Sequence, residues 1–190
     1  MKQKPEIKIV RARRRSFSLR MKDGIFICRA PLFAPKSEIQ AFLGKNALWM
    51  EKRLAEQAAR EKLLAEEGAF TEEELSAMKA KAKKLIPERV AYYAPLVGVK
   101  TGRISIRAQK TRWGSCSAAG NLNFNCLLIL APLPVLDSVV VHELCHMKEM
   151  NHSARFYAEV RRVFPEYDKW HAFLKKEGEK WLIRLPSRSN

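Results

Sequence analysis

Three of the four histidines of this 190-residue chain, His142, His146 and His152, lie within one short segment. His142, Glu143 and His146 form an H-E-x-x-H sequence inside a stretch whose apolar spacing predicts a helix. Histidines four residues apart on a helix lie about 40° apart around its axis and about 6 Å along it, so both imidazoles can bind one tetrahedral ion. Glu143 can take a proton from a metal-bound water and deliver it to a leaving group. The pattern predicts metal-dependent hydrolysis, with Zn2+ preferred and Ni, Co, Mn or Fe left open.

The third ligand must come from outside this motif, and the candidates are Glu149, His152, Cys145 and His171. We favour His152, which can reach the ion if the helix stops and the chain turns back at Asn151, a residue that enters the left-handed conformation easily. On a straight helix Glu149 lies about 7 Å along the axis beyond the midpoint of the first two histidines. Cys145 is expected to be a small buried hydrophobe, and His171 a surface or packing residue.

The chain is strongly basic, with 36 Lys and Arg against 20 Asp and Glu and a net charge of +16. Half of that surplus lies in residues 1–30, which carry ten basic residues against Glu6 and Asp23. This segment is either a solubilising arm or a phosphate-binding element for nucleic acid or nucleotides. The candidate phosphate contacts are Arg11, Arg13, Arg14 and Arg15.

Compartment and membrane contact are constrained by the cysteines and by the apolar segments. The four cysteines show no C-x-x-C spacing, and we expect them to be reduced thiols without a disulfide. The longest apolar stretch is interrupted by Pro132 and Pro134 and is too short to span a bilayer. The N-terminus lacks the apolar region of a secretory signal. A cytoplasmic protein with no membrane partner is therefore expected.

The first half of the chain is predicted to hold a small β element followed by helices. Residues 6–29 alternate around the turn signal at residues 23–24 and predict two or three antiparallel strands. Ser37 with Gln40 predicts a cap for a long helix that runs toward residue 68. Thr71 with Glu74 predicts another, which Pro87 breaks or kinks.

The second half is predicted to mix strands with helices. Residues 103–107 and 121–130 are expected to be strands that can pair, and residues 135–147 a largely buried helix. Ser153 caps a further helix, and a last one follows Pro165. We expect an α+β chain in three parts: a basic β element over residues 1–35, a helical connector over 36–84 and a catalytic domain over 85–190.

Longer motifs add a family resemblance. The tract RWGSCS at residues 112–117, Ala131-Pro132 and VVVHELCHMKEMNHSARF at residues 139–156 resemble the YgjP-like metal-dependent hydrolase family, which is related to the SprT-like and WLM zincin peptidases. The resemblance covers about residues 85–182. It implies a minimal zincin-like metallopeptidase core, a short antiparallel sheet over an active-site helix, and a peptide or protein substrate. The implied ligands are His142, His146 and His152, with Glu143 as the catalytic glutamate.

Substrate contacts are less well indicated than the metal site. In one interpretation, Arg112 and Trp113 line the substrate cleft. In the other, this tract is a Gly-containing turn against which Trp113 packs. Asn125 is a third candidate contact. It is followed by Cys126-Leu127 where the family often has Trp-Arg, and Tyr157 stands where Trp is common.

These observations favour a zinc-dependent hydrolase, first of all a metallopeptidase that uses a Glu-activated, metal-bound water. A metal-dependent hydrolase of nucleotide phosphoanhydrides is an alternative, because the basic charge could neutralise phosphate. A nucleic-acid-binding module with a structural metal is another, although structural sites normally use four protein ligands. A protease recruited to nucleic acid by its basic arm combines two of these hypotheses.

Overall fold

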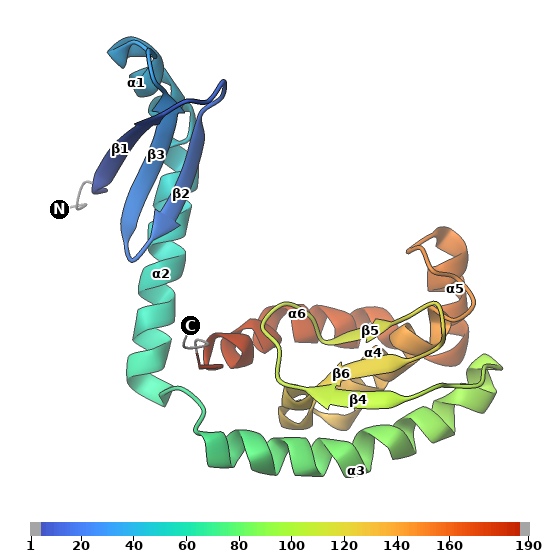
Figure 1. Ribbon diagram of the computed structural model, residues 1–190. Coiled ribbons are helices and arrows are strands. Elements are labelled where there is room, and N and C mark those ends of the chain that lie inside the picture. Colours follow the sequence, from blue (N-terminus) through green and yellow to red (C-terminus); the bar gives the residue numbers. More distant parts are fainter. Residues whose placement is uncertain (1–4, 187–190) are drawn as a thin grey trace. The chain divides into compact units, whose positions relative to one another are not determined.

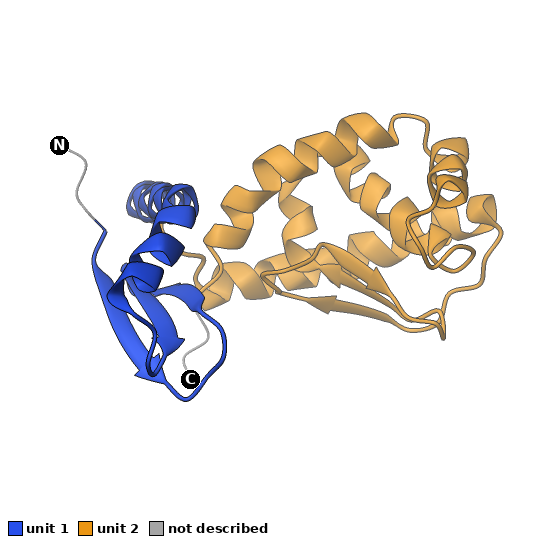
Figure 2. Ribbon diagram, turned by 90° about the horizontal axis from the view of Figure 1, so that it is seen from above, with its two compact units in different colours: residues 1–67 blue, residues 68–190 orange. Residues whose placement is uncertain are grey.

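The computed structural model describes residues 5–186 and divides into two compact units, residues 1–67 and 68–190 (Figure 2). We refer to them as the N-terminal and C-terminal units. Residues 1–4 and 187–190 of the predicted first and last parts lie outside the described residues. Among the described residues, no helix is both long enough and apolar enough to cross a membrane.

The N-terminal unit begins with a three-stranded sheet, β1 (Ile7–Ala12), β2 (Ser18–Lys22) and β3 (Ile25–Pro31), in the order β1-β3-β2 (Figure 1). The predicted turn joins β2 to β3 as an antiparallel hairpin, and Asp23 and Gly24 have φ of 51° and 79°. Two consecutive positive φ angles match the twist of a tight hairpin. β1 pairs parallel to β3, where only antiparallel pairing was predicted, because residues 13–17 carry the chain across to the far edge of β3.

Two helices follow, α1 (Lys36–Lys45) and α2 (Ala47–Glu67), where the sequence predicted a single one. The break is at Asn46, whose side-chain amide donates to the carbonyl of Phe42 (2.8 Å) and so competes with helix continuation. The predicted cap at Ser37 is wrong: α1 already starts after Pro35, and no side chain caps it. The core of this unit is small and includes Cys28, Ala30, Ala34 and Ile39.

The C-terminal unit opens with the long helix α3 (Glu72–Val97), which runs across the predicted boundary between residues 84 and 85. The capping box of Thr71 and Glu74 is confirmed by reciprocal hydrogen bonds of 3.1 and 2.8 Å. Of the break or kink predicted at Pro87, the break does not occur, because a buried apolar face that includes Ile86 and Val90 continues through it. Packing of such a face outweighs the single hydrogen bond that proline removes.

The second sheet contains β4 (Ile104–Arg107), β5 (Gly114–Cys116) and β6 (Leu122–Asn125), in the order β4-β6-β5. β6 is antiparallel to β5 but parallel to β4, so the sheet is mixed and has the same strand arrangement as the first. The strand predicted over residues 121–130 ends early, and a 3-10 helix, η1 (Cys126–Leu130), follows it. The Asn125 side chain accepts from the amide of Leu127 (3.2 Å) and caps that helix.

Three helices complete this unit: α4 (Leu133–Cys145), α5 (Ala154–Val163) and α6 (Tyr167–Ile183). The predicted Ser153 cap on α5 is confirmed, with the Phe156 amide 3.2 Å from Ser153 Oγ. α4 is buried along most of its length, and its Asp137 forms a two-pronged ion pair with Arg89 of α3 (2.7 and 2.8 Å). The α+β class is confirmed, and its central helix carries the H-E-x-x-H sequence.

Candidate metal centre

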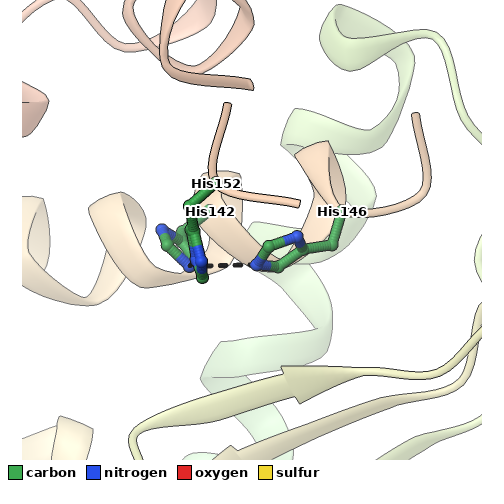
Figure 3. A group of neighbouring side chains, drawn as sticks. All are labelled: His142, His146 and His152. Carbon is green, nitrogen blue, oxygen red and sulfur yellow. Dashed lines mark hydrogen bonds between the residues drawn. The ribbon is translucent and has the colours of Figure 1, made fainter. Parts of the chain in front are cut away.

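The imidazoles of His142, His146 and His152 converge at the C-terminal end of α4 and the chain that follows it (Figure 3). Nε2 of His142 lies 3.2 Å from Nε2 of His146 and 3.0 Å from Nε2 of His152. One ring nitrogen of each histidine therefore belongs to a cluster whose atoms all lie within 4.8 Å of one another. The structure brings together the three ligands that the sequence predicted.

This donor set fits a divalent transition metal. A tetrahedral Zn2+ with Zn–N distances of about 2.0–2.1 Å places its nitrogen ligands about 3.3 Å apart. The two measured separations from His142 are within a few tenths of an ångström of that value. Three neutral imidazoles that point at one centre also leave a fourth position for a water or a substrate atom.

The outer ring nitrogens of two histidines have defined partners. Nδ1 of His146 lies 3.1 Å from the carbonyl of Glu149, which can only accept, so this nitrogen carries the hydrogen and Nε2 keeps its lone pair. Nδ1 of His142 lies 2.8 Å from the hydroxyl of Tyr167, whose oxygen is 3.2 Å from Nδ1 of His171. If His142 donates to Tyr167 and Tyr167 donates to His171, Nε2 of His142 is likewise free to bind metal.

Burial favours the neutral, metal-binding form of the His142 and His146 imidazoles. The pKa of His142 is lowered to about 3, first by burial and then by repulsion from His146, His152 and His171. The pKa of His146 is also lowered, mainly by burial. Cys145, between these positions, is completely buried, and burial raises its pKa to about 12. It is the inert small hydrophobe that was predicted.

The return of the chain to His152 uses a different turn from the predicted one. Among the described residues that are not glycine, Asp23 alone has positive φ, so Asn151 does not take the left-handed conformation. The helix instead ends in tight turns, with the amides of Lys148 and Glu149 each 3.0 Å from the carbonyl of Cys145. The Ser153 amide then bonds to the Asn151 carbonyl (2.8 Å) and directs the chain into α5.

An ionic network across this turn ties it to two helices. Glu159 on α5 accepts from Lys148 (2.7 Å) and from Arg162 (2.8 and 2.9 Å). Arg162 also donates to the carbonyl of Leu96 near the end of α3 (2.9 Å). These charge-assisted bonds lower the pKa of Glu159 to about 2. The segment that carries His152 is thus bonded on both sides.

Glu143 lies under β5, where Gly114 leaves room for it. A Cβ atom added to Gly114 would come 2.6 Å from Cγ and 2.7 Å from Cδ of Glu143. Burial raises the pKa of Glu143 to about 8, and the nearby positive charge of Arg112 acts in the opposite direction. A carboxyl group whose pKa lies near neutrality is suited to both accepting and delivering a proton.

The three residues predicted to contact the substrate lie in different environments. Trp113 packs edge-on against Trp181 (6.1 Å between ring centroids) and fits against Gly178, as in the packing interpretation. Asn125 is completely buried, and its amide donates to the carbonyls of Gln109 (2.7 Å) and Arg112 (3.1 Å). It therefore holds the segment that leads to β5, while Arg112 itself is exposed.

Several contributions to this site were not predicted from the sequence. Tyr167 is 25 residues from His142 and was not predicted, and Glu149 takes part through its backbone carbonyl instead of its carboxylate. His171 joins the site through Tyr167. The Gly in the RWGSCS tract was the one available sign of a close approach at β5.

The predicted phosphate contacts belong to the other unit. Arg11, Arg13, Arg14 and Arg15 lie at the end of β1 and in the loop after it, within residues 1–67.

Part of the chain is similar in sequence to a curated protein. A curated relative, the UTP pyrophosphatase of Escherichia coli (strain K12), is 37% identical over 60 residues. The match covers 32% of this chain, which thus spans about a third (34%) of the relative's length.

Two solved structures, the metallopeptidase zymogens abylysin of Pyrococcus abyssi and jannalysin of Methanocaldococcus jannaschii, are 21% and 24% identical, with TM-scores of 0.45 and 0.44. Each match covers 50% of this chain and 96% or 97% of the other. The model of the YgjP-like metallopeptidase domain matches residues 73–177, which is more than half of the sequence and includes α4 and all three clustered histidines. The chain belongs to the YgjP-like metallopeptidase domain family.

Proposed function

We propose that the chain is a zinc-dependent peptidase whose C-terminal unit cleaves peptide bonds. The chain belongs to a metallopeptidase family, and metallopeptidases are hydrolases. The observation that carries the proposal is the convergence of three imidazoles, in which the Nε2 atoms of His146 and His152 each lie from Nε2 of His142 at a distance suited to a shared tetrahedral ion. No fourth side chain belongs to this cluster among residues 5–186. Such an open three-donor site is typical of catalytic zinc centres.

His142, His146 and His152 would hold the ion. When bound, a zinc ion polarises a carbonyl and makes water acidic near neutral pH. Glu143 is the group that accepts the proton from the attacking water and passes it to the leaving amine. Tyr167 and the Glu149 carbonyl orient two of the imidazoles, and Gly114 leaves Glu143 the space it needs.

Metal analysis combined with a peptide screen tests this proposal. The wild-type protein is expected to hold about one zinc per chain and to cleave unstructured peptides. Glu143→Gln should keep the metal but lower kcat by about 10²- to 10⁴-fold, because a carboxamide cannot accept the proton. Glu149→Gln is the matched control, since the described contact of Glu149 with His146 is made by its backbone carbonyl. Near wild-type activity of Glu143→Gln on a verified peptide would refute the role of Glu143.

A second candidate function is hydrolysis of a nucleoside triphosphate at the same site. It is favoured by the partial similarity to a UTP pyrophosphatase and by the exposed guanidinium of Arg112 near Glu143. An arginine there could neutralise a phosphate oxygen. Release of pyrophosphate from UTP by the wild type, lost in both Glu143→Gln and Arg112→Ala, would support this function. Peptide cleavage without any turnover of nucleotides would exclude it.

A further inference from the structure

The N-terminal unit contains a groove of about 470 Å3 that is separate from the histidine cluster. Two loops form it, and its lining residues are Arg13, Arg14, Arg15, Pro31, Leu32 and Phe33. β1 and β3 run parallel and in register from Ile7 beside Phe26 to Ala12 beside Pro31, so the loops that follow the two strands emerge at the same edge of the sheet. The strand pairing thus brings three consecutive arginines next to an apolar turn.

The turn after β3 is held in a fixed shape. The guanidinium of Arg11 donates from Nη1 to the carbonyls of Leu32 (2.9 Å) and Ala34 (2.7 Å), and the Ala34 amide bonds to the Pro31 carbonyl (3.2 Å). Phe33, in the middle of this turn, is 91% exposed. An aromatic side chain that is almost fully solvated on an ordered turn is unusual for packing and is typical of a contact surface.

The arginines of the opposite loop differ in their contacts. Arg14 donates to Ser18 Oγ (2.8 Å), which fixes the loop. Arg13 and Arg15 are exposed, and within residues 5–186 neither forms a hydrogen bond or an ion pair. Glu6 and Asp23 are the only acidic residues among the first 30. The charge in this groove is therefore largely uncompensated and available to an anion.

We propose that this groove binds single-stranded nucleic acid, with Arg13 and Arg15 on phosphates and an unpaired base stacked on Phe33. Guanidinium groups pair with phosphate through two parallel hydrogen bonds, and every base offers a face to an aromatic ring. A duplex keeps its bases stacked on one another and offers none to Phe33. A membrane surface would favour an extended apolar face over a concave, nucleotide-sized groove.

Fluorescence anisotropy tests the site, using the full-length protein and a labelled single-stranded RNA of about 20 nucleotides at several salt concentrations. The Arg13→Ala/Arg15→Ala variant should bind at least about tenfold more weakly, and its salt slope should fall by about 1.4, since each phosphate contact on a single strand contributes about 0.7. Lys45→Ala/Lys52→Ala on α1 and α2 removes the same charge outside the groove and should leave the slope almost unchanged.

The aromatic contact has its own test. Phe33→Ala should weaken binding by about tenfold with an unchanged salt slope, because stacking releases no counterions. Phe33→Trp keeps an aromatic ring and should bind RNA about as tightly as the wild type. Glu143→Gln, a change in the other unit, should also bind RNA like the wild type. Circular dichroism confirms that the variants are folded, which their exposed positions favour.

Three results would overturn the proposal. The first is an equal loss of affinity in the groove variant and the lysine control, which would indicate diffuse charge. The second is equal binding of single-stranded RNA by Phe33→Ala and wild type. The third is binding to duplex RNA or to phosphatidylserine vesicles that is stronger than binding to the single strand.

Discussion

The two units use their polar side chains in opposite ways. In the C-terminal unit, His142 and His146 are largely buried, and their ring nitrogens have partners that set their orientation. In the N-terminal unit, Arg13 and Arg15 are exposed and have no partner within the described residues. A catalytic centre needs fixed geometry, whereas a polyanion surface needs charge that is free to pair. Substitutions at the histidine site should therefore have large effects on function, and substitutions at the arginine surface should have graded ones.

The largest effect is expected from removing a proposed metal ligand. His152→Ala should abolish stoichiometric zinc binding, because only two donors remain. His171→Ala is the matched control, since its Nδ1 contacts Tyr167 and its ring does not join the cluster. Zinc content by atomic absorption separates the two variants. A His152→Ala variant that keeps the zinc content of the wild type and of His171→Ala would remove His152 from the ligand set.

The same substitution at two glycines contrasts the units directly. Gly114→Ala should destabilise the protein by about 1–3 kcal/mol and lower kcat by about a hundredfold, because the added Cβ displaces Glu143. Gly44→Ala on α1 meets nothing within 4 Å and should stabilise the protein by about 0.5–1 kcal/mol. Chemical denaturation and peptide turnover measure both. A Gly114→Ala enzyme with full kcat would show that Glu143 has room to shift.

A smaller effect is expected from the hydroxyl that orients His142. Tyr167→Phe should lower zinc affinity by about tenfold, within the 10- to 100-fold range seen when a group that orients a metal ligand is lost. Competition with a chelator gives the affinity. Tyr92→Phe, at an exposed position on α3, is the control and should bind zinc like the wild type. An unchanged affinity for Tyr167→Phe would mean that packing alone sets the His142 ring.

A still smaller effect is expected from the network behind His152. Glu159→Gln should cost about 1 kcal/mol of stability at neutral pH. Because the folded pKa of Glu159, about 2, is below its ordinary value of 4.5, this stabilisation is present above about pH 4.5 and disappears as the pH falls toward 2. Denaturation of both proteins at three pH values within this window measures the difference.

Glu56→Gln tests whether that effect is particular to the C-terminal unit. Glu56 pairs with Arg53 on the exposed face of α2, with the two side chains 43% and 50% exposed. Such a surface pair contributes little, and its removal should change stability by less than about 0.5 kcal/mol. If Glu56→Gln lost as much stability as Glu159→Gln, ion pairs would stabilise the two units equally and the contrast would not hold for them.

Local signals predicted the candidate site better than the sheets around it. The spacing of His142 and His146 on a helix requires only helix geometry, and the capping residues Thr71 and Ser153 act within three residues. Strand direction depends on where a distant segment returns, and the parallel pairing of β1 with β3 and of β4 with β6 was therefore missed. Tyr167 escaped prediction for the same reason.

Two expectations failed, wholly or in part, where a local rule met tertiary packing. Proline usually ends a helix, yet α3 continues through Pro87 because the buried face that includes Ile86 and Val90 continues beyond it. Asn151 was expected to supply the turn after α4, but hydrogen bonds to the Cys145 carbonyl make the turn without any left-handed residue. The sequence thus predicted that His152 joins the cluster, but not the kind of turn that brings it there.

In both sheets, the strand that comes last in the sequence lies in the middle. During synthesis, β1 and β2 leave the ribosome before their shared partner β3, and β4 and β5 before β6. A nascent chain that stops short of Leu122 has two strands that do not pair with each other and leave their edges open. Each sheet therefore forms only once its third strand has emerged, and β1 and β4 are exposed to wrong partners for the longest time.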